Sequence, residues 1–289
     1  MSESLERPPV GNAYIERIHK QAEAVLEQDR ILEQDFIEPY GKDTVARDLA
    51  WVAKREEEHA RQSTPESIEA KQVADIFEAL ILWNGEQSNW LGESAITKKT
   101  SKFDDYENGV DAIIEFQTEN PRTASHLGLA ADVTFSSDTT RKFDRLRKLI
   151  EKGELARVKY FHFEHMNMHG QLSKLPEVII GAERRTVMEL AELWDQKKFK
   201  SLADHKVQIM MLLQMREQLL TFSMYAESLG KTHLADIYRE RLQIIQDILD
   251  KKKDIALRVK YEIDDKVHAS IMNFMARWQK DMEGKQRAA

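Results

Sequence analysis

Three acidic residues stand in segments whose other positions are mostly apolar. Glu78 lies in the stretch from Val73 to Trp83, and Asp111 and Asp132 each alternate with apolar residues in a later segment. Mg²⁺ prefers oxygen ligands and keeps several of its waters, so two or three carboxylates on a rigid sheet can hold it. The three acids are therefore candidate ligands for Mg²⁺ or Mn²⁺, and the bound ion would activate water against a phosphodiester.

Each aspartate also has a structural interpretation. Asp111 follows Asn108-Gly109, where an aspartate often serves a turn, and Asp132 could cap a loop or pair with Arg141. A shared site is favoured because it explains at once a glutamate on a buried helix and an aspartate on each of two interior strands.

Other potential ligands are less well placed. Asp104 and Asp105 are rival metal ligands, but their position in a turn favours solvated loop residues. Four further side chains lie at the end of a predicted strand, at spacings that suit Zn²⁺. They are His162, Glu164, His165 and His169. The segment from Met166 to Gly170 is predicted to be a loop. Because no complete ligand set is fixed, a structural or incidental role is favoured for these four side chains.

The pattern of apolar residues in the N-terminal part of the sequence predicts helices. Apolar residues recur at helical spacing from Asn12 to Phe36, and Pro39-Tyr40-Gly41 closes that segment. A second helix begins near Asp43, a good N-cap. Ser63 and Glu66 then form a Ser-x-x-Glu capping box that opens the long buried helix carrying Glu78.

Beyond this helix the hydrophobic period changes to that of strands. The predicted strands run over Ser94–Phe103, Gly109–Gln117 and Leu127–Ser136, with a turn at Asp104–Gly109 between the first two. Apolar residues on both faces of the second segment are typical of an interior strand.

A crossover is expected next. A helix capped by Asp138-Thr139-Thr140 and ended by Gly153 leads into a strand over Arg157–Phe163. Strand, helix and strand in this order predict a parallel crossover. A short strand over Glu177–Gly181 and another helix through Trp194 follow.

The C-terminal third contains only helical patterns. Two long segments, interrupted at 229–232, predict a helical hairpin whose methionines fill its core. The chain is therefore expected to divide into an N-terminal helical arm (1–63), an α/β core (64–200) and a C-terminal helical hairpin (201–289).

The order of elements over residues 65–163 is helix, strand, strand, strand, helix, strand. This order resembles the restriction-endonuclease-like core of the PD-(D/E)xK nucleases, over about a third of the chain. The resemblance implies that Glu78 is the helix carboxylate, Asp111 the second-strand aspartate, and Asp132-Val133-Thr134 the third-strand (D/E)xK element.

Thr134 departs from the pattern of that superfamily, which has a lysine at this place. A hydroxyl cannot supply the positive charge that orients water, so either a lysine on another element replaces it, as happens in this superfamily, or catalysis has been lost. Lys142, Lys159, Lys98 and Lys99 are the candidates, and the sequence does not choose among them.

Charge and composition limit the partners. A net charge of -7 argues against a uniformly basic nucleic-acid binder, but eight basic and three acidic residues between Arg141 and Lys159 form a candidate phosphate-facing patch. A solvated helix face of mixed charge is the alternative.

The absence of Cys excludes thiolate catalysis and cysteine-based zinc sites. Short apolar runs and a polar Met1–Val10 predict a cytoplasmic protein with no membrane partner.

The leading hypothesis is a Mg²⁺- or Mn²⁺-dependent nuclease that acts on DNA, with Glu78, Asp111 and Asp132 as metal ligands. Its catalytic candidates are Asp111, Asp132, Thr134, Lys142 and Lys159. The main alternative is a nuclease-like fold that has lost catalysis and binds partners through its helices, which could also form a homodimer. A third hypothesis, a helical scaffold with an incidental α/β insert, predicts that Asp111 and Asp132 face opposite sides of the sheet.

Overall fold

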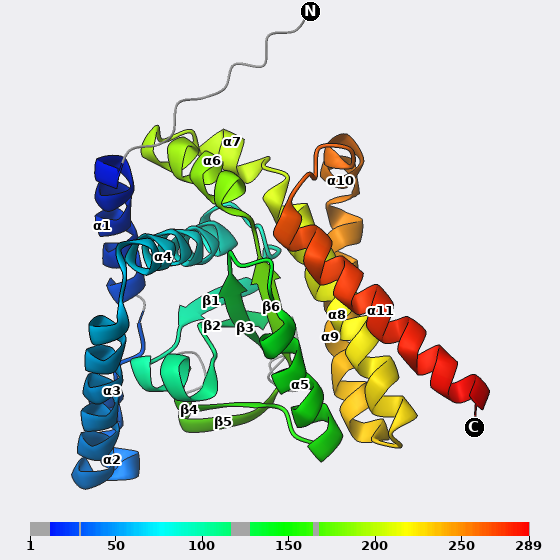
Figure 1. The fold of residues 1–289 in the computed structure, drawn as a ribbon, viewed down its shortest axis with the longest axis horizontal. Helices are drawn as coiled ribbons and strands as arrows, with labels where there is room; N and C mark the ends of the chain where they lie inside the picture. The colour runs from blue at the N-terminus through cyan, green and yellow to red at the C-terminus, as the bar shows by residue number, and fades with distance from the viewer. Residues whose placement is uncertain (1–11, 29, 117–127, 164–167, 289) are drawn as a thin grey trace, which may run out of the picture.

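A small mixed sheet lies among helices in the computed structural model (Figure 1), which describes residues 12–28, 30–116, 128–163 and 168–288. Its strand order is β1-β2-β3-β6, with β1, β2 and β3 antiparallel and β6 parallel to β3. The strands are β1 (Ala95–Lys99), β2 (Ala112–Phe116), β3 (Gly128–Thr134) and β6 (Glu177–Gly181). The protein is therefore mixed α/β, as expected.

The crossover differs from the predicted one. After β3 the chain forms α5 (Thr140–Lys152), which ends at Gly153 with φ 79° as predicted. It then forms β4 (Ala156–Phe163) and β5 (Met168–Leu175), which pair with each other in a separate antiparallel sheet. The strand that returns beside β3 is β6, not the predicted 157–163 segment, and part of the expected 166–170 loop is the start of β5.

The hairpin β4–β5 forms its own layer because its apolar side chains pack on one face of the main sheet. A separate hydrophobic cluster joins Ile113 of β2 and Ala130 of β3 to Val158, Phe161 and Leu175. Alternate residues of β2 and β3 face the opposite side and belong to the main core.

The caps of α3 and α4 lie two residues and one residue, respectively, from where the sequence placed them. Gly41, with φ 79°, precedes α3 in place of Asp43. The capping box of α4 uses Thr64 and Ser67 rather than Ser63 and Glu66, with Pro65 at the first helical position. These elements are α1 (Asn12–Gln28), η1 (Glu33–Phe36), α2 (Ile37–Tyr40), α3 (Lys42–Gln62) and α4 (Pro65–Gln87).

The C-terminal part contains the predicted turn between α8 and α9, but the second predicted segment is divided into three helices. The last of them, α11, returns along α8, where Trp278 packs against Phe222 and Tyr225. The helices are α6 (Arg184–Asp195), α7 (Phe199–Ala203), α8 (Val207–Ser228), α9 (Thr232–Lys251), α10 (Lys253–Val259) and α11 (Lys266–Ala288). None of the helices in the described part of the chain is long and apolar enough to cross a membrane.

Two glutamines attach α8 to the edge of the sheet. The side chain of Gln218 accepts from the N–H of Ile179 and donates to its carbonyl, both at 2.8 Å. Gln214 does the same with Gly181, at 2.9 and 2.8 Å. Since β6 is an edge strand, these amides satisfy backbone groups that would otherwise be unpaired inside the protein.

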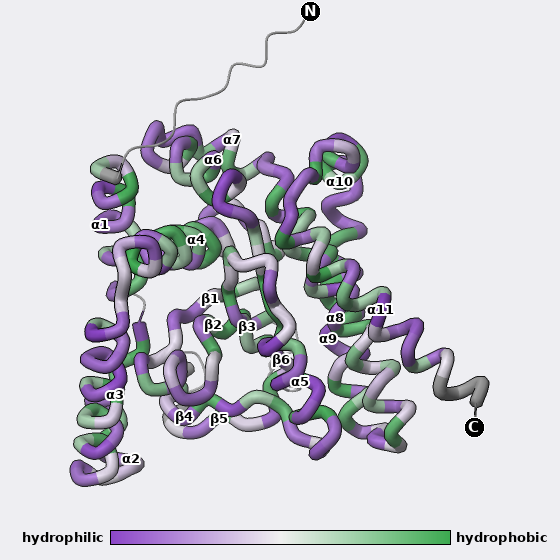
Figure 2. The backbone as a smooth tube through the Cα atoms, in the orientation of Figure 1, coloured by the Kyte–Doolittle hydropathy of each residue, from purple (hydrophilic) through white to green (hydrophobic). Residues whose placement is uncertain are grey.

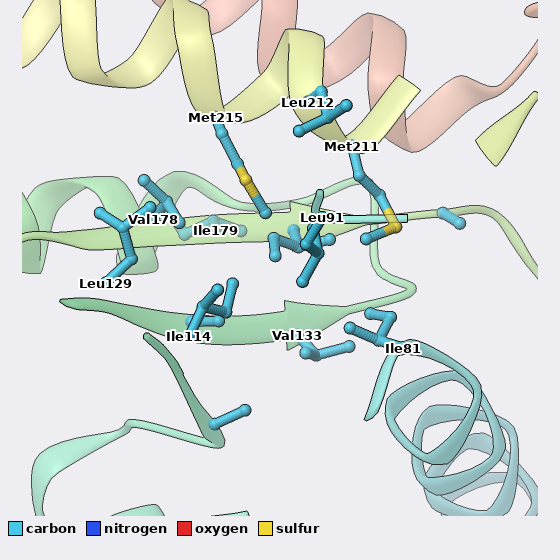
Figure 3. Packing of buried hydrophobic residues seen from close by; sticks show 14 of the residues in the cluster. Ile81, Leu91, Ile114, Leu129, Val133, Val178, Ile179, Met211, Leu212 and Met215 are labelled. Carbon is cyan, nitrogen blue, oxygen red and sulfur yellow. The ribbon is translucent and has the colours of Figure 1, made fainter. Parts of the chain in front are cut away.

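One hydrophobic core joins the three parts of the chain. It contains Ile18 of α1, the buried residues of α4 and the sheet, and Met211 and Met215 of α8. Figure 2 shows α4 as a largely hydrophobic helix, and Figure 3 shows Ile81, Val133 and the two methionines around the sheet. The predicted burial of α4 on most of its faces is confirmed, and this burial fixes Glu78 against the sheet.

Candidate functional site

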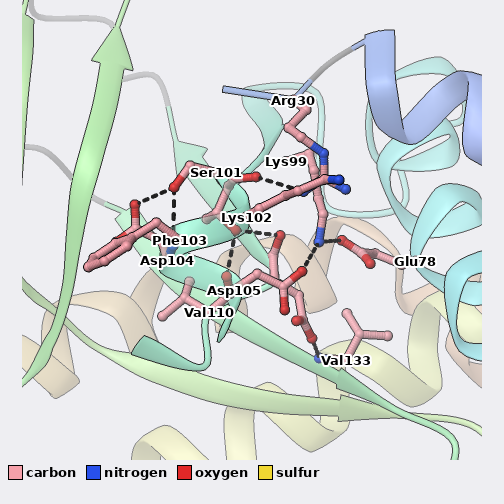
Figure 4. Close-up of polar contacts among 12 residues, drawn as sticks. Arg30, Glu78, Lys99, Ser101, Lys102, Phe103, Asp104, Asp105, Val110 and Val133 are labelled. Carbon is pink, nitrogen blue, oxygen red and sulfur yellow. Dashed lines mark hydrogen bonds and ion pairs between the residues drawn. The ribbon is translucent and has the colours of Figure 1, made fainter. Parts of the chain in front are cut away.

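A buried lysine forms the centre of a charged cluster at the end of β1. Lys99 is the last residue of β1, and its side chain is 1% exposed. Its Nζ lies 2.6 Å from Oε1 of Glu78 and 3.0 Å from Oδ2 of Asp105 (Figure 4). Burial disfavours the charged amine, but the two carboxylates outweigh it and raise the pKa of Lys99.

Glu78 reaches Lys99 from α4. The apolar face of α4 packs on the sheet, so the carboxylate is placed beside the end of β1 with little access to water. Burial, only partly offset by Lys99, raises the pKa of Glu78 to about 7.

A single π-helical turn, η2 (Asp104–Asn108), supplies Asp105. Asp104 holds this turn in place, because its carboxylate accepts hydrogen bonds from the backbone N–H groups of Lys159 and Tyr160 at 2.7 and 3.0 Å. It also accepts from Ser101 at 2.8 Å. Asp104 is therefore structural, and its neighbour Asp105 points toward Lys99 (Figure 4).

Asp111 lies one residue before β2. Gly109 ends the π-helical turn with φ 67°, and the chain then enters the strand. One carboxylate oxygen of Asp111 accepts the N–H of Val133 at 2.6 Å, so the side chain lies over β3 on the side that Val133 faces.

Asp105 and Asp111 are hydrogen-bonded to each other. Burial, Asp105 and Glu78 hold the pKa of Asp111 well above its usual range. Burial also opposes the charge of Asp105, but Lys99 and the hydrogen bonds outweigh it and lower the pKa of Asp105. The surroundings therefore favour the neutral form of Asp111 and the charged form of Asp105.

The cluster opens into a cavity of about 530 Å³. Its walls come from α1, α3 and α4, and its floor contains Lys99, Asp111 and Val133. Among the described residues that line it, seven are carboxylates and four are Lys or Arg. The carboxylates are Glu23, Glu27, Glu56, Asp75, Glu78, Asp105 and Asp111, and the cations are Arg30, Lys71, Lys99 and Lys102. The lining attracts cations and repels dense negative charge.

Asp132, a predicted metal ligand, does not line this cavity. Its carboxylate forms ion pairs with Lys142 and Arg145 of α5, and Arg145 also binds Glu177. The physical reason is strand alternation: Val133 faces the cavity, so its neighbour Asp132 faces α5. The expectation that Glu78, Asp111 and Asp132 converge on one metal site is corrected accordingly, because Asp132 is held by α5.

The other predicted catalytic residues are also elsewhere. Thr134 is buried, and its hydroxyl accepts the N–H of Ser136 at 3.2 Å. Lys142 is paired with Asp132, and Lys159 is paired with Asp48. Of the four candidate lysines, only Lys99 lines the cavity.

Much of the predicted basic patch is engaged within the protein. Lys142 and Arg145 bind the acids on β3 and β6, and Arg147 lies 4.7 Å from the ring centre of Trp278. The ammonium of Lys159 lies 5.0 Å from the ring centre of Phe103. These four cations hold elements together, so they do not form a continuous phosphate-binding surface.

The predicted histidine cluster is described only in part. His162 of β4 and His169 of β5 are register partners in the small sheet, whereas Glu164 and His165 lie outside the described residues. Within the described ranges, no three Asp, Glu or His side chains are arranged so that they could hold one metal ion. At the cavity floor, the ammonium of Lys99 supplies the positive charge between Glu78 and Asp105.

Comparison with protein-family models, curated proteins and solved structures finds no match.

Sequence reasoning identified two members of the cluster as ligands, Glu78 and Asp111, but assigned Asp105 to a solvated turn. Lys99, the partner of Asp105, was one of four candidate lysines that the sequence did not distinguish. The available signal was the alternation of β1, in which Ala95, Thr97 and Lys99 share the buried side. A lysine on the buried side of a strand requires a carboxylate partner nearby.

Proposed function

We propose that this protein is a metal-dependent phosphodiesterase that acts on nucleic acid at the cavity formed by Glu78, Lys99, Asp105 and Asp111. The observation that carries the proposal is the meeting of these three acids and one buried lysine from four separate segments. The order α4, β1, β2, β3, α5 and β6 supports the resemblance to the PD-(D/E)xK core, with β4–β5 as an insertion.

The donor set suits Mg²⁺ or Mn²⁺ in its chemistry. Asp105 and Asp111 are more exposed than Lys99, and their carboxylates would hold the divalent ion. Glu78 stays paired with Lys99 and would not be a ligand of that ion. The ion, when bound, supplies Lewis-acid activation of water and of the phosphate.

Lys99 is the relocated cation in this proposal. Its ammonium is held by two carboxylates on a rigid strand end, so it can orient water and neutralise charge on the phosphate with little reorganisation. The N–H of Val133 fixes the orientation of Asp111. Asp132 takes no part in the proposed reaction, because its carboxylate is ion-paired with Lys142 and Arg145.

The test is cleavage of single-stranded and plasmid DNA, each measured separately, by the full chain with Mg²⁺ or Mn²⁺. Asp111→Asn and Lys99→Met should each lower the rate roughly 10²-fold or more, since each removes a group at the reacting phosphate. Asp138→Asn, on an exposed turn before α5, is the matched control and should retain activity. Cleavage that persists in both cavity variants would refute the assignment.

A catalytically inactive binding module is the second candidate. The arrangement that favours it is the closed pairing of Lys99 with Glu78 and Asp105, which leaves no ready-made three-carboxylate site among the described residues. Calorimetry separates the two: the phosphodiesterase should bind Mn²⁺ in the wild type and lose that binding in Asp111→Asn. A binding module should bind no Mn²⁺ in either protein.

A further inference from the structure

The helical walls of the cavity limit what can reach the cluster. Residues of α1, α3 and α4 surround Glu78, Lys99 and Asp105, and the space between them is about 530 Å³, equivalent to a cube of about 8 Å edge. Pockets of roughly 300 to 1,000 Å³ hold one small-molecule-sized group. The major groove of B-DNA alone is about 12 Å wide, so an intact duplex is too bulky to enter.

Two aromatic side chains lie on the cavity wall next to the acids. His59 of α3 and Tyr106 of η2 both line the cavity, with ring centres 5.4 Å apart at an interplanar angle of 75°. Tyr106 follows Asp105 directly and is half-buried, whereas His59 is exposed. Unpaired bases stack on aromatic rings, and every base has a face that can do so.

Two cations line the same space. Arg30, at the end of the segment after α1, donates to the carbonyl of Thr100 and to Glu27. Lys102 bridges to Glu56 of α3 at 2.8 Å, with both side chains 40% exposed. A phosphate could replace Glu56 as the partner of Lys102, because a half-exposed ion pair contributes little stability.

The acidic lining disfavours dense negative charge. Duplex DNA carries one charge per about 1.7 Å of axis, and a single strand one per about 3.4 Å. The carboxylate excess around the cavity therefore opposes a duplex more strongly than a single strand.

We propose that the cavity takes an unpaired nucleic-acid strand, with a base against Tyr106 and His59 and a phosphate between Arg30 and Lys102, and that it excludes intact duplex. This inference rests on the proposed phosphodiesterase function and names its substrate class.

The experiment compares two DNA substrates of the same sequence with the full chain and Mn²⁺. One is a linear single strand, and the other is a small relaxed duplex circle, which contains no unpaired loop or end. Both cleavage and binding, by fluorescence anisotropy, are measured. The single strand should be cleaved and bound at least 10-fold better than the closed duplex. Equal or better binding of the closed duplex would overturn the inference.

Variants of the aromatic pair provide the second measurement. His59→Ala should weaken single-strand binding about 5- to 100-fold, in line with the loss of one stacked base. Tyr106→Phe keeps the ring and should bind normally. Tyr261→Ala, which removes an aromatic side chain that is 88% exposed and outside the cavity, is the matched control. An unchanged affinity in His59→Ala would also overturn the inference.

Different outcomes refute the phosphodiesterase proposal and the strand preference. If neither substrate is cleaved with Mg²⁺ or Mn²⁺ but the single strand binds selectively and depends on His59, the phosphodiesterase is refuted and the strand preference stands. If both substrates are cleaved equally, the phosphodiesterase stands and the strand preference is refuted.

Discussion

At the scale of single residues, the protein holds several carboxylates in surroundings that disfavour their charge. Glu78 is stabilised by the neighbouring ammonium, and Asp111 by its hydrogen bonds. Glu115 of β2 is less well compensated: it is 5% exposed, neither carboxylate oxygen has a hydrogen-bond partner among the described residues, and the charge of Lys98 only partly offsets its burial. Burial raises its pKa to about 7 from an ordinary value of 4.5.

This burial predicts a pH dependence of stability. The folded state binds the Glu115 proton more tightly than the unfolded state does. The contribution of this proton to the free energy of unfolding is therefore fully present below about pH 4.5, and it is lost as the pH rises through 7. Glu115→Gln cannot ionise, so it should exceed the wild type in stability at pH 8 by on the order of 1 kcal/mol. The difference should vanish at pH 5.

Chemical unfolding at pH 5 and pH 8 measures this effect. The control is Glu57→Gln, which neutralises an exposed glutamate of α3. It should leave the pH dependence unchanged. An advantage of Glu115→Gln that is the same at both pH values would contradict the explanation.

At the scale of elements, the free edge of the main sheet is covered by a helix rather than by another strand. Gln214 and Gln218, one turn apart on α8, each pair with both backbone groups of one residue of β6. The spacing of four places both amides on one helix face, opposite alternate residues Ile179 and Gly181 of the strand. This contact fixes the register between α8 and the sheet.

Gln218→Leu should therefore destabilise the protein by roughly 2 to 4 kcal/mol, because it leaves the N–H and the carbonyl of Ile179 buried and unpaired. Urea unfolding followed by circular dichroism measures the change. Gln243→Leu, at an exposed position of α9, makes the same chemical change without this contact and should stay within about 0.5 kcal/mol of the wild type. Similar values for the two variants would contradict the role given to Gln218.

At the scale of the whole molecule, one hydrophobic core connects the N-terminal helices, the sheet and the C-terminal helices. Ile15 and Ile18 of α1 pack into the same cluster as Met211 of α8 and Trp278 of α11. The cavity depends on this continuity, because its walls come from helices that precede the sheet in the chain.

A shortened chain tests how far the parts depend on one another. A protein ending at Ala203 loses α8 to α11, exposes the edge of β6 and removes much of the core. It should lack the cooperative thermal transition expected of the full chain, as measured by near-ultraviolet circular dichroism and calorimetry. A cooperative transition in the shortened chain would instead support the boundary at residues 200 and 201 that the sequence predicts.

The sequence alone determined most of the elements, because hydrophobic period and capping residues act locally. The apolar run around Glu78 predicted a buried helix, and Gly153 predicted the end of α5. The three alternating segments predicted the antiparallel strands, and the acids at Glu78 and Asp111 were identified before their partners were known.

Only the tertiary structure decided which acids share a site. Whether Asp132 faces the cavity or α5 depends on the direction of alternate side chains on β3, and a shift of one residue reverses it. Whether Lys99 or another lysine joins Glu78 depends on the distance between segments far apart in the chain. Local patterns carry no information about such distances, so strand pairing and helix packing had to place Lys99, Asp105 and Asp111 together.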